Sequence, residues 1–418
     1  MTAQRQPGDW RIILYSSLGS GLDFYDFAIF AVFAGVIGPV FFPAGDDLAS
    51  LLQTYLLFAV SYLVRPIGGV VFGHLGDRFG RRRAMLLSLW LGAFAAFGIA
   101  ALPGHAELGA AATVGFIALR ILQGLTIGGQ IPGTITFVSE FLPLRRGLAC
   151  GLVFMLIELG LLLGNAVSLG LHAALTPDAV AAWGWRIAYA LAGLFGFASY
   201  LLQHRLEETP AFAAATAARL PLAEVVRSHG PALLTGMALT ALPAALLGVV
   251  YLQMPAWLIH IVGTDPQVAT AATSLGVLVW ALGIGLAGWI GDRGLRPAEL
   301  ALAAVITLVL SWPFYRWLAT GIDPVVPLLL AAIPSALMFG AFPAMLTALF
   351  PAALRFSGIA LAYNLAFALF GGVGPLVATW AVQASGVAAA PAWYLMASAV
   401  VGLAGLWGLR ILHLHSRP

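Results

Sequence analysis

Long apolar runs separated by short polar segments make up almost the whole chain. Twelve of these runs reach the roughly 20 mostly apolar residues that a membrane-spanning helix needs. Their bounds are 12–40, 50–75, 84–104, 109–141, 147–174, 184–205, 230–261, 267–290, 298–319, 324–350, 356–385 and 390–412. A membrane β-barrel would instead alternate apolar and polar residues along short strands. The pattern therefore predicts an all-α polytopic membrane protein with twelve transmembrane helices.

Composition excludes a soluble protein. Hydrophobic residues make up 61% of the 418 residues and charged residues only 9%, against about 25% charged in soluble domains. The single Cys150 excludes a disulfide framework. The sequence contains no phosphate-binding G-x-x-x-x-G-K-S/T loop, no histidine pattern with strong metal-ligand spacing and no catalytic triad motif. We therefore expect neither an enzyme nor an ATP-driven pump, and no metal or other cofactor.

The arginines orient the predicted helices. All 20 basic residues are arginine, and sixteen of them fall in loops or ends on one side of the predicted membrane. Only Arg186 and Arg316 fall on the other side, and the positive-inside rule makes the first side cytoplasmic. Both termini are then cytoplasmic, in the cytoplasmic membrane of a bacterium. The net charge of +3 is a topological signal and does not indicate nucleic-acid binding.

The sequence repeats itself across its two halves. GHLGDRFGRRR at 73–83 and GWIGDRGLRP at 288–297 share G-x-x-G-D-R, 215 residues apart. A second pair, FLPLRRG at 141–147 and FPAALRFSG at 350–358, supports the repeat. We therefore expect a six-helix bundle over residues 1–205, a cytoplasmic linker over 206–229 and a second six-helix bundle over 230–418. Parallel repeats of this kind are typical of secondary transporters that work by alternating access.

The first loop resembles the signature of the major facilitator superfamily, G-x-x-x-D-R-x-G-R-R. The stretches LDFYDFAIF at 22–30, RILQGLTIGGQIPG at 120–133 and RLEETPAF at 205–212 are similar to its metabolite:proton symporter family. The resemblance implies the major facilitator fold and uptake of a small organic acid or zwitterion, driven by a proton gradient. Residues that match the signature are Gly73, Asp77, Arg78, Gly80, Arg81 and Arg82.

The same resemblance gives this loop a gating role. It implies that Asp77, Arg78 and Arg82 stabilise an outward-open state through contacts with neighbouring helix ends. Glu140 lies at a helix C-terminus, where the helix dipole disfavours an acid, so we expect it to pair with these arginines. The degenerate copy GDRGLRP should contribute less.

Charged residues within membrane spans are rare and functional, and five in this chain lie centrally in the predicted spans: Asp23, Asp26, Arg65, Arg120 and Glu158. Asp23 lies twelve residues beyond Arg11 and Arg65 twelve residues before Asp77, so both lie about 18 Å deep at 1.5 Å per residue. Asp23 and Asp26 share a helix face. We predict that Asp23 pairs with Arg65 and that Asp26 carries the proton. The alternative is that both aspartates only hold neighbouring helices together.

Three further polar groups complete the predicted central layer. Arg65 either binds a substrate carboxylate or stays in a fixed pair. Gln130 replaces a glutamate that the related family often has, and Glu158 is our hypothesis for the group that takes over part of the lost charge. The alternative for Glu158 is a permanent pair with Arg120. We assign Asp23, Asp26, Arg120 and Glu158 to proton coupling.

The second half has no central charge. At the position that repeats Arg65, 215 residues later, stands Trp280. A lone aromatic in a bundle is often only packing, whereas the amide of Asn364 needs polar partners at this depth. The residues assigned to substrate binding are Arg65, Gln130, Tyr251, Gln253, Trp280, Tyr363 and Asn364.

The sequence thus predicts a monomeric symporter whose partners are a small molecule, protons and lipid. The alternative is a proton-coupled antiporter that exports a drug or siderophore. ELGLLLGNAV at 158–167 lacks the G-x-x-x-G-P-x-x-G-G pattern of superfamily antiporters, which favours uptake. A non-transporting sensor or membrane enzyme is disfavoured by the repeat, the signature loop and the buried charges.

Overall fold

The computed structural model describes residues 9–42, 47–215 and 220–415, and this part of the chain contains helices and no strands. Within these described ranges, ten helical stretches are long and apolar enough to cross a membrane. One of them, Pro266–Leu318, bends at Gly294 (φ 89°) and comprises two predicted spans. Together with α2, every predicted span coincides with a helix or an interrupted helix, and the twelve-helix prediction is confirmed.

The first half of the chain supplies six long helices joined by short turns. Two of the connections contain the short helices α4 (His105–Leu108) and α7 (Pro177–Ala179), the latter followed by a π-helical turn, η1 (Val180–Gly184). The long helices are α1 (Asp9–Phe41), α2 (Asp47–Phe79), α3 (Arg81–Ala101), α5 (Ala110–Phe141), α6 (Arg146–Ala174) and α8 (Trp185–Gln203).

The second half repeats this plan with two interrupted helices. One runs through α11 (Gly230–Ala245), η2 (Leu246–Leu252), α12 (Met254–Trp257) and η3 (Leu258–Val262); the other through α16 (Arg355–Ala366), η6 (Phe367–Gly372) and α17 (Gly374–Ser385). Between and after them lie α13 (Pro266–Ile290), η4 (Gly291–Leu295), α14 (Arg296–Leu318), α15 (Val325–Leu349), η5 (Ala352–Leu354) and α18 (Pro391–His415). The linker carries α9 (Pro210–Ala214) and α10 (Pro221–Ser228).

Glycines let the helices of the first half approach closely. A Cβ atom at Gly160 of α6 would lie 1.9 Å from the Gly21 carbonyl oxygen of α1. One at Gly128 of α5 would lie 2.1 Å from the Arg65 carbonyl oxygen of α2. Small residues allow such backbone contacts where apolar lipid gives no hydrophobic drive to helix association. These contacts fix the rotation of α1 and α2, which carry three of the intramembrane charges.

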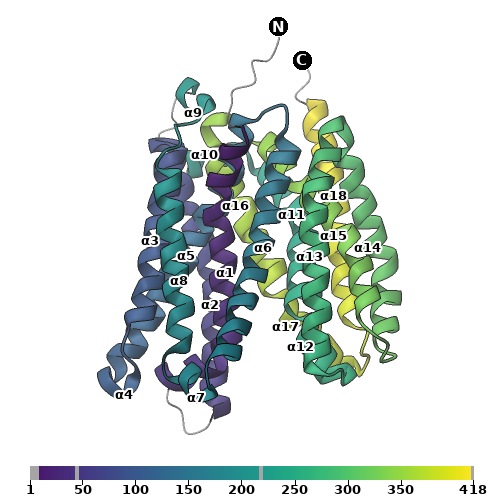
Figure 1. The fold of residues 1–418 in the computed structure, drawn as a ribbon. Helices are drawn as coiled ribbons and strands as arrows, with labels where there is room; N and C mark the ends of the chain where they lie inside the picture. Colours follow the sequence, from purple (N-terminus) through teal and green to yellow (C-terminus); the bar gives the residue numbers. More distant parts are fainter. Residues whose placement is uncertain (1–8, 43–46, 216–219, 416–418) are drawn as a thin grey trace.

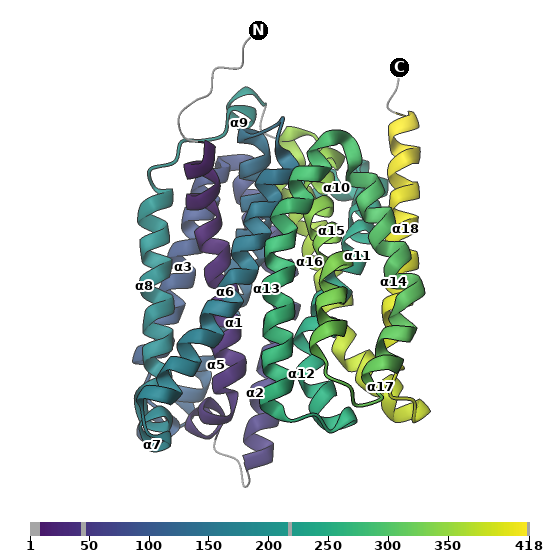
Figure 2. The same cartoon turned by 45° about the vertical axis from the view of Figure 1, so that its right-hand side comes forward.

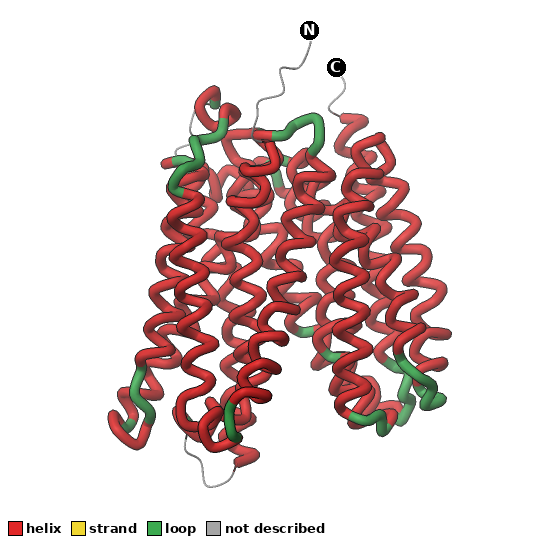
Figure 3. The backbone as a smooth tube through the Cα atoms, viewed as in Figure 1, coloured by secondary structure: helices red, strands yellow, loops and turns green. Residues whose placement is uncertain are grey.

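The two halves lie side by side, with α6 against α13 and α2 against α16 (Figures 1 and 2). The start of α1 and the end of α18 lie at one end of the molecule, together with α9 and α10. We call this end, which holds the loops around residues 73–83, 141–147 and 288–297, the arginine-rich end. In the view of Figure 3 the two groups of helices meet there and diverge toward the opposite end. The exact bounds of the halves at residues 205 and 230 stay predictions.

Candidate functional site

A buried ion pair joins α1 to α5. Asp26 Oδ2 lies 2.7 Å from Arg120 Nη1, and Gln123 Nε2 donates to Asp26 Oδ1 at 2.8 Å. Arg120 Nη1 also donates to Gln123 Oε1 at 2.8 Å, because Gln123 follows Arg120 by one helical turn. The Arg120 guanidinium also lies 3.9 Å from the ring centroid of Phe30. Both oxygens of Asp26 are therefore bound, and the carboxylate has a fixed counter-charge.

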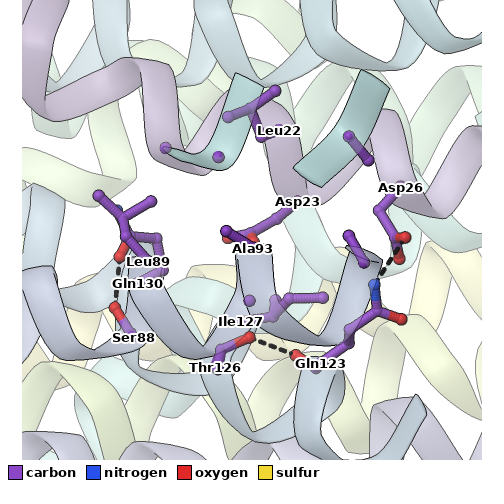
Figure 4. A pocket seen from close by; sticks show the side chains of 15 residues that line it. Leu22, Asp23, Asp26, Ser88, Leu89, Ala93, Gln123, Thr126, Ile127 and Gln130 are labelled. Atoms are coloured by element: carbon purple, nitrogen blue, oxygen red, sulfur yellow. Dashed lines mark hydrogen bonds between the residues drawn. The ribbon is translucent and has the colours of Figure 1, made fainter. Parts of the chain in front are cut away.

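The predicted Asp23–Arg65 pair is wrong in this structure. Among the described residues, the ion pairs within 4.0 Å include none that involves Asp23 or Arg65. Arg65 instead lies over the ring of Tyr62, 3.9 Å from its centroid. Counting residues gives the depth of a side chain but not its direction around the helix. Asp26 reaches Arg120 and Gln123, whereas Asp23 points into the cavity described next (Figure 4).

Asp23 faces a narrow cavity inside the first half, where it is partly exposed although its Oδ2 atom is buried without a hydrogen-bond partner. Gln130 lines the same cavity, and its Oε1 accepts from Ser88 Oγ at 2.5 Å (Figure 4). The cavity has a volume of about 30 Å³. Its walls are formed by Gly19, Leu22, Asp23, Asp26, Ser88, Leu89, Gly92, Ala93, Ala96, Gln123, Thr126, Ile127, Gln130, Ala192 and Gly196.

Two further buried charges have unused hydrogen-bonding atoms. Neither carboxylate oxygen of Glu158 has a hydrogen-bond partner, and Nε and Nη1 of Arg65 have none either. The alternative that Glu158 pairs with Arg120 is wrong in this structure, because Arg120 is held by Asp26. The hydroxyl of Tyr363, also without a partner, lies within electrostatic range of Arg65, Glu158 and Asp23. Glu158 and Arg65 lie on α6 and α2, the helices that pack against α13 and α16 of the second half.

Aromatic rings of the second half line the same region. Tyr251 and Trp280 stack with ring centroids 4.2 Å apart, and Phe339 packs edge-on against Trp280 at 4.8 Å. Tyr363 stacks on Phe367 at 4.3 Å. The indole nitrogen of Trp280 is buried without a hydrogen-bond partner. The position that repeats Arg65 thus carries a stacked aromatic platform.

The two predicted amides of the second half have different surroundings. Asn364 Nδ2 crosses between the halves and donates to the Gly128 carbonyl oxygen of α5 at 2.7 Å. Gln253 Nε2 donates within the second half to Thr379 Oγ1 at 2.7 Å and to the Pro375 carbonyl oxygen at 3.1 Å. Asn364 therefore connects the halves in this state, whereas Gln253 fixes η2 against α17.

At the arginine-rich end, Asp77 binds the start of a helix in the opposite half. Its carboxylate accepts from the backbone N–H of Phe356 at 3.2 Å and of Ser357 at 2.8 Å, at the start of α16. A Cβ atom at Gly73 would lie 2.9 Å from Ser357 Cα, so the signature glycine makes this approach possible. An anion at a helix N-terminus satisfies unpaired N–H groups and complements the helix dipole.

Glu140 has basic partners, as predicted, but they are not Arg78 and Arg82. It lies 3.3 Å from Arg81 Nε and 2.8 Å from Arg355 Nη1. Arg81 is fully buried, pairs with Asp77 at 3.2 Å, and donates to the Ala352 carbonyl oxygen of the other half. Arg78 is exposed, and Arg82 donates to the His204 carbonyl oxygen at 2.5 Å. Arg81 is the central residue of this network because it is the first residue of α3 and lies against the linker.

The second copy of the motif makes the same kind of contact, and how much it contributes relative to the first copy stays a prediction. Asp292 accepts from the backbone N–H of Gly147 at 2.7 Å and of Leu148 at 2.9 Å, at the start of α6. It also pairs with Arg296. The shared G-x-x-G-D-R sequence is enough to predict this contact, because only its aspartate is needed to bind a helix N-terminus.

The linker binds this network as well. The Glu208 carboxylate accepts from the backbone N–H of Arg81 and of Arg82, each at 3.2 Å. Thr209 Oγ1 donates to Glu140 Oε2 at 2.6 Å. Gly80, with φ 111°, has no side chain to clash with Glu208. These linker residues had no predicted role, although RLEETPAF contains them.

One family model and several known proteins are similar to this chain over most of its length. The family model described as "Major Facilitator Superfamily" matches residues 17–375. The ectoine/proline transporter ProP of Corynebacterium glutamicum is 33% identical over 415 residues, covering 93% of this chain and 82% of that protein. The citrate-proton symporter of Salmonella typhi is 28% identical, covering 96% and 94%. The proline/betaine transporter of Escherichia coli K12 is 28% identical, covering 98% and 84%.

Solved structures share the fold. The proton:xylose symporter XylE bound to 6-bromo-6-deoxy-D-glucose superposes with a TM-score of 0.78, covering 96% of this chain and 94% of that one at 18% identity. The human organic anion transporter MFSD10 gives a TM-score of 0.67 at 17% identity, covering 97% and 100%. At these identities the likeness concerns the fold alone.

Proposed function

Because the chain belongs to the Major Facilitator Superfamily, we propose that it takes up a small carboxylate-bearing metabolite together with protons, by alternating access. One observation carries the proposal: a layer of buried charges in the first half contains one satisfied pair, Asp26–Arg120, beside charged groups with polar atoms that make no hydrogen bond. Buried charges without partners are costly. A proton and a charged substrate are the ligands that would satisfy them.

Asp23 is the proton carrier in this proposal. Asp26 is held by Arg120 and Gln123, whereas the buried Oδ2 of Asp23 has no hydrogen-bond partner. A buried carboxyl oxygen that makes neither a hydrogen bond nor a close ion pair favours the protonated group. This assignment reverses the sequence-based division between the two aspartates. Asp26 and Arg120 then contribute to coupling by fixing the environment of Asp23.

Arg65 and Glu158 supply opposite charges for a substrate that is a zwitterion. The unused guanidinium nitrogens of Arg65 suit a carboxylate. Glu158 suits an ammonium group, and the Tyr251–Trp280 stack offers ring faces that attract cations. Proline, betaine and ectoine, which are in the names of the relatives, have this pair of charges. Citrate, in the name of another relative, would use only the arginine.

The state described here is closed at the arginine-rich end by Asp77, Asp292 and the Glu140–Arg355 pair. The positive-inside rule makes this end cytoplasmic, in the cytoplasmic membrane of a bacterium. The state is then the one from which substrate is taken up, and the protein works as a monomer. Opening requires these contacts to break while contacts form at the opposite end.

Uptake into proteoliposomes with an alkaline interior tests the proposal. We expect accumulation of labelled proline or betaine that stops when an ionophore collapses the pH gradient. Arg65→Gln should raise KM by about tenfold or more, since a charge-assisted contact is lost, while Arg11→Gln at an exposed site serves as the control. Proton-driven export of cationic drugs without metabolite uptake would instead identify the antiporter.

A further inference from the structure

A proline inside α5 leaves one backbone carbonyl of that helix without its usual donor. In an α-helix each N–H group donates to the carbonyl oxygen four residues earlier. Pro132 lies inside α5 and has no N–H group, so the carbonyl oxygen of Gly128 lacks this bond. Gly128 is buried, and a buried carbonyl without a donor is costly. Another group is therefore needed to satisfy this oxygen.

Asn364 of the second half supplies the missing donor. Its Nδ2 atom donates to the Gly128 carbonyl oxygen at 2.7 Å and to the Ala360 carbonyl oxygen of its own helix at 2.8 Å. An asparagine amide has two N–H groups, so one fixes the side chain on α16 while the other reaches the first half. The side chain is fully buried. An amide from the opposite half thus replaces the N–H group that Pro132 lacks.

Two glycines let three helices meet at this bond. A Cβ atom at Gly69 of α2 would lie 2.6 Å from Asn364 Nδ2, and one at Gly128 would lie 2.9 Å from the Gly69 backbone nitrogen. Helix α16 accordingly packs against both α2 and α5. Gly69 follows Arg65 by four residues in the direction of Asp77. The bond therefore lies about 6 Å closer to the arginine-rich end than Arg65 does.

Opening of the arginine-rich end would break this bond. Nearer that end the same two helices, α2 and α16, are joined by the contact between Asp77 and the Ser357 N–H group. Alternating access requires the halves to separate there, which moves α16 away from α2 and α5. In the closed state, by contrast, loss of the Asn364 amide would leave the Gly128 oxygen buried without a donor. The bond thus favours the closed state over the open one.

We propose that the bond between Asn364 and Gly128 is a latch, which holds the two halves together on the arginine-rich side of Arg65, and that Pro132 creates its acceptor. Asn364 is then a positioning residue for alternating access and not a substrate ligand. The latch goes beyond the proposed function, because it concerns the closed state itself and does not depend on which molecule is carried.

Asn364→Leu and Pro132→Ala test the latch, alone and together. Spin labels at Arg83 and Leu295, both exposed and in opposite halves, report how many molecules are open at the arginine-rich end. Asn364→Leu leaves a buried carbonyl without a donor, so the ratio of open to closed molecules should rise about fivefold or more. Pro132→Ala restores the N–H group within α5. In that background Asn364→Leu should change the ratio by less than about twofold.

Two matched variants control for general damage. Pro343→Ala changes a buried proline inside α15 and should leave the effect of Asn364→Leu at its full size. Thr240→Val removes a buried hydroxyl that donates to a carbonyl of its own helix, and it should leave the ratio unchanged. An effect of Asn364→Leu that is equally large with and without Pro132 overturns the latch, as does no effect in either background.

A second comparison covers the case in which Asn364→Leu does not fold. Pro132→Ala alone should raise the ratio of open to closed molecules about twofold or more, because the Gly128 oxygen then no longer needs a donor from the other half. An unchanged ratio in that variant overturns the latch. All these distances are measured without substrate. If the protein takes up neither proline nor betaine while the ratios change as expected, the proposed function fails and the latch stands.

Discussion

Asp77 and Asp292 each bind the first turn of a helix in the opposite half of the chain. Asp77 accepts from the N–H groups of Phe356 and Ser357, and Asp292 from those of Gly147 and Leu148. The two contacts are equivalent in the two repeats and close the same end of the molecule. Each contact supplies an acceptor for N–H groups that are otherwise unpaired at a helix start. Residues of both halves therefore stabilise the closed state.

Asp77→Asn and Asp292→Asn should therefore open the arginine-rich end to similar extents. Losing one charged cap costs about 0.5–2 kcal/mol, which shifts the equilibrium toward the open state by about 2- to 30-fold. Distances between spin labels at Arg83 and Leu295, both exposed and in opposite halves, report the shift. Asp178→Asn, at an exposed position, is the control. A shift in Asp77→Asn alone would contradict the equivalence of the two copies.

The architecture was predictable because lipid imposes its demands on each helix separately. Every span needs sufficient length and an apolar composition, and both are visible in the sequence. The repeat identified Asp292 as the partner position of Asp77. The copy is degenerate in sequence, but the contact needs only a carboxylate opposite a helix start, and Asp292 supplies one.

The partners of the buried charges were less predictable. Depth counting placed Asp23 level with Arg65, but the rotation of α1 is fixed by backbone contacts such as Gly21 with Gly160. No local pattern in the sequence reveals that rotation. Gln123 was also missed, although its spacing of three residues from Arg120 on one helix would have suggested a shared partner.

Breaking the Asp26–Arg120 pair should lower stability more than removing it as a whole. A single Arg120→Gln or Asp26→Asn change leaves one buried charge unpaired, which typically costs about 3–5 kcal/mol. The double variant leaves no such charge, so its melting temperature in detergent should exceed that of the less stable single variant. Thermal unfolding of all four proteins measures the coupling. If the losses of the single variants simply add, the two groups do not interact.

Gly128→Ala and Gly160→Ala should both destabilise the first half. Their Cβ atoms would lie 2.1 Å and 1.9 Å from backbone oxygens of α2 and α1, which cannot move aside as a side chain can. Overpacking of this kind costs about 1–3 kcal/mol or more. Gly170→Ala on α6 meets no atom within 4 Å, and it should gain up to about 1 kcal/mol from helix propensity. Equal melting temperatures for Gly160→Ala and Gly170→Ala would contradict the close contact.

The linker should protect the first turn of α3. The N–H groups of Arg81 and Arg82 have no acceptor within the helix, and the Glu208 carboxylate binds both. Glu208→Gln removes the charge, so hydrogen exchange in a peptide that begins several residues before Arg81 and contains both N–H groups should speed up by about 2- to 30-fold, the range for losing a helix cap. Glu207→Gln, at the neighbouring exposed position, should leave the exchange unchanged. Equal protection in both variants would mean that the linker does not stabilise this end of α3. The arginine-rich end would then close without the linker.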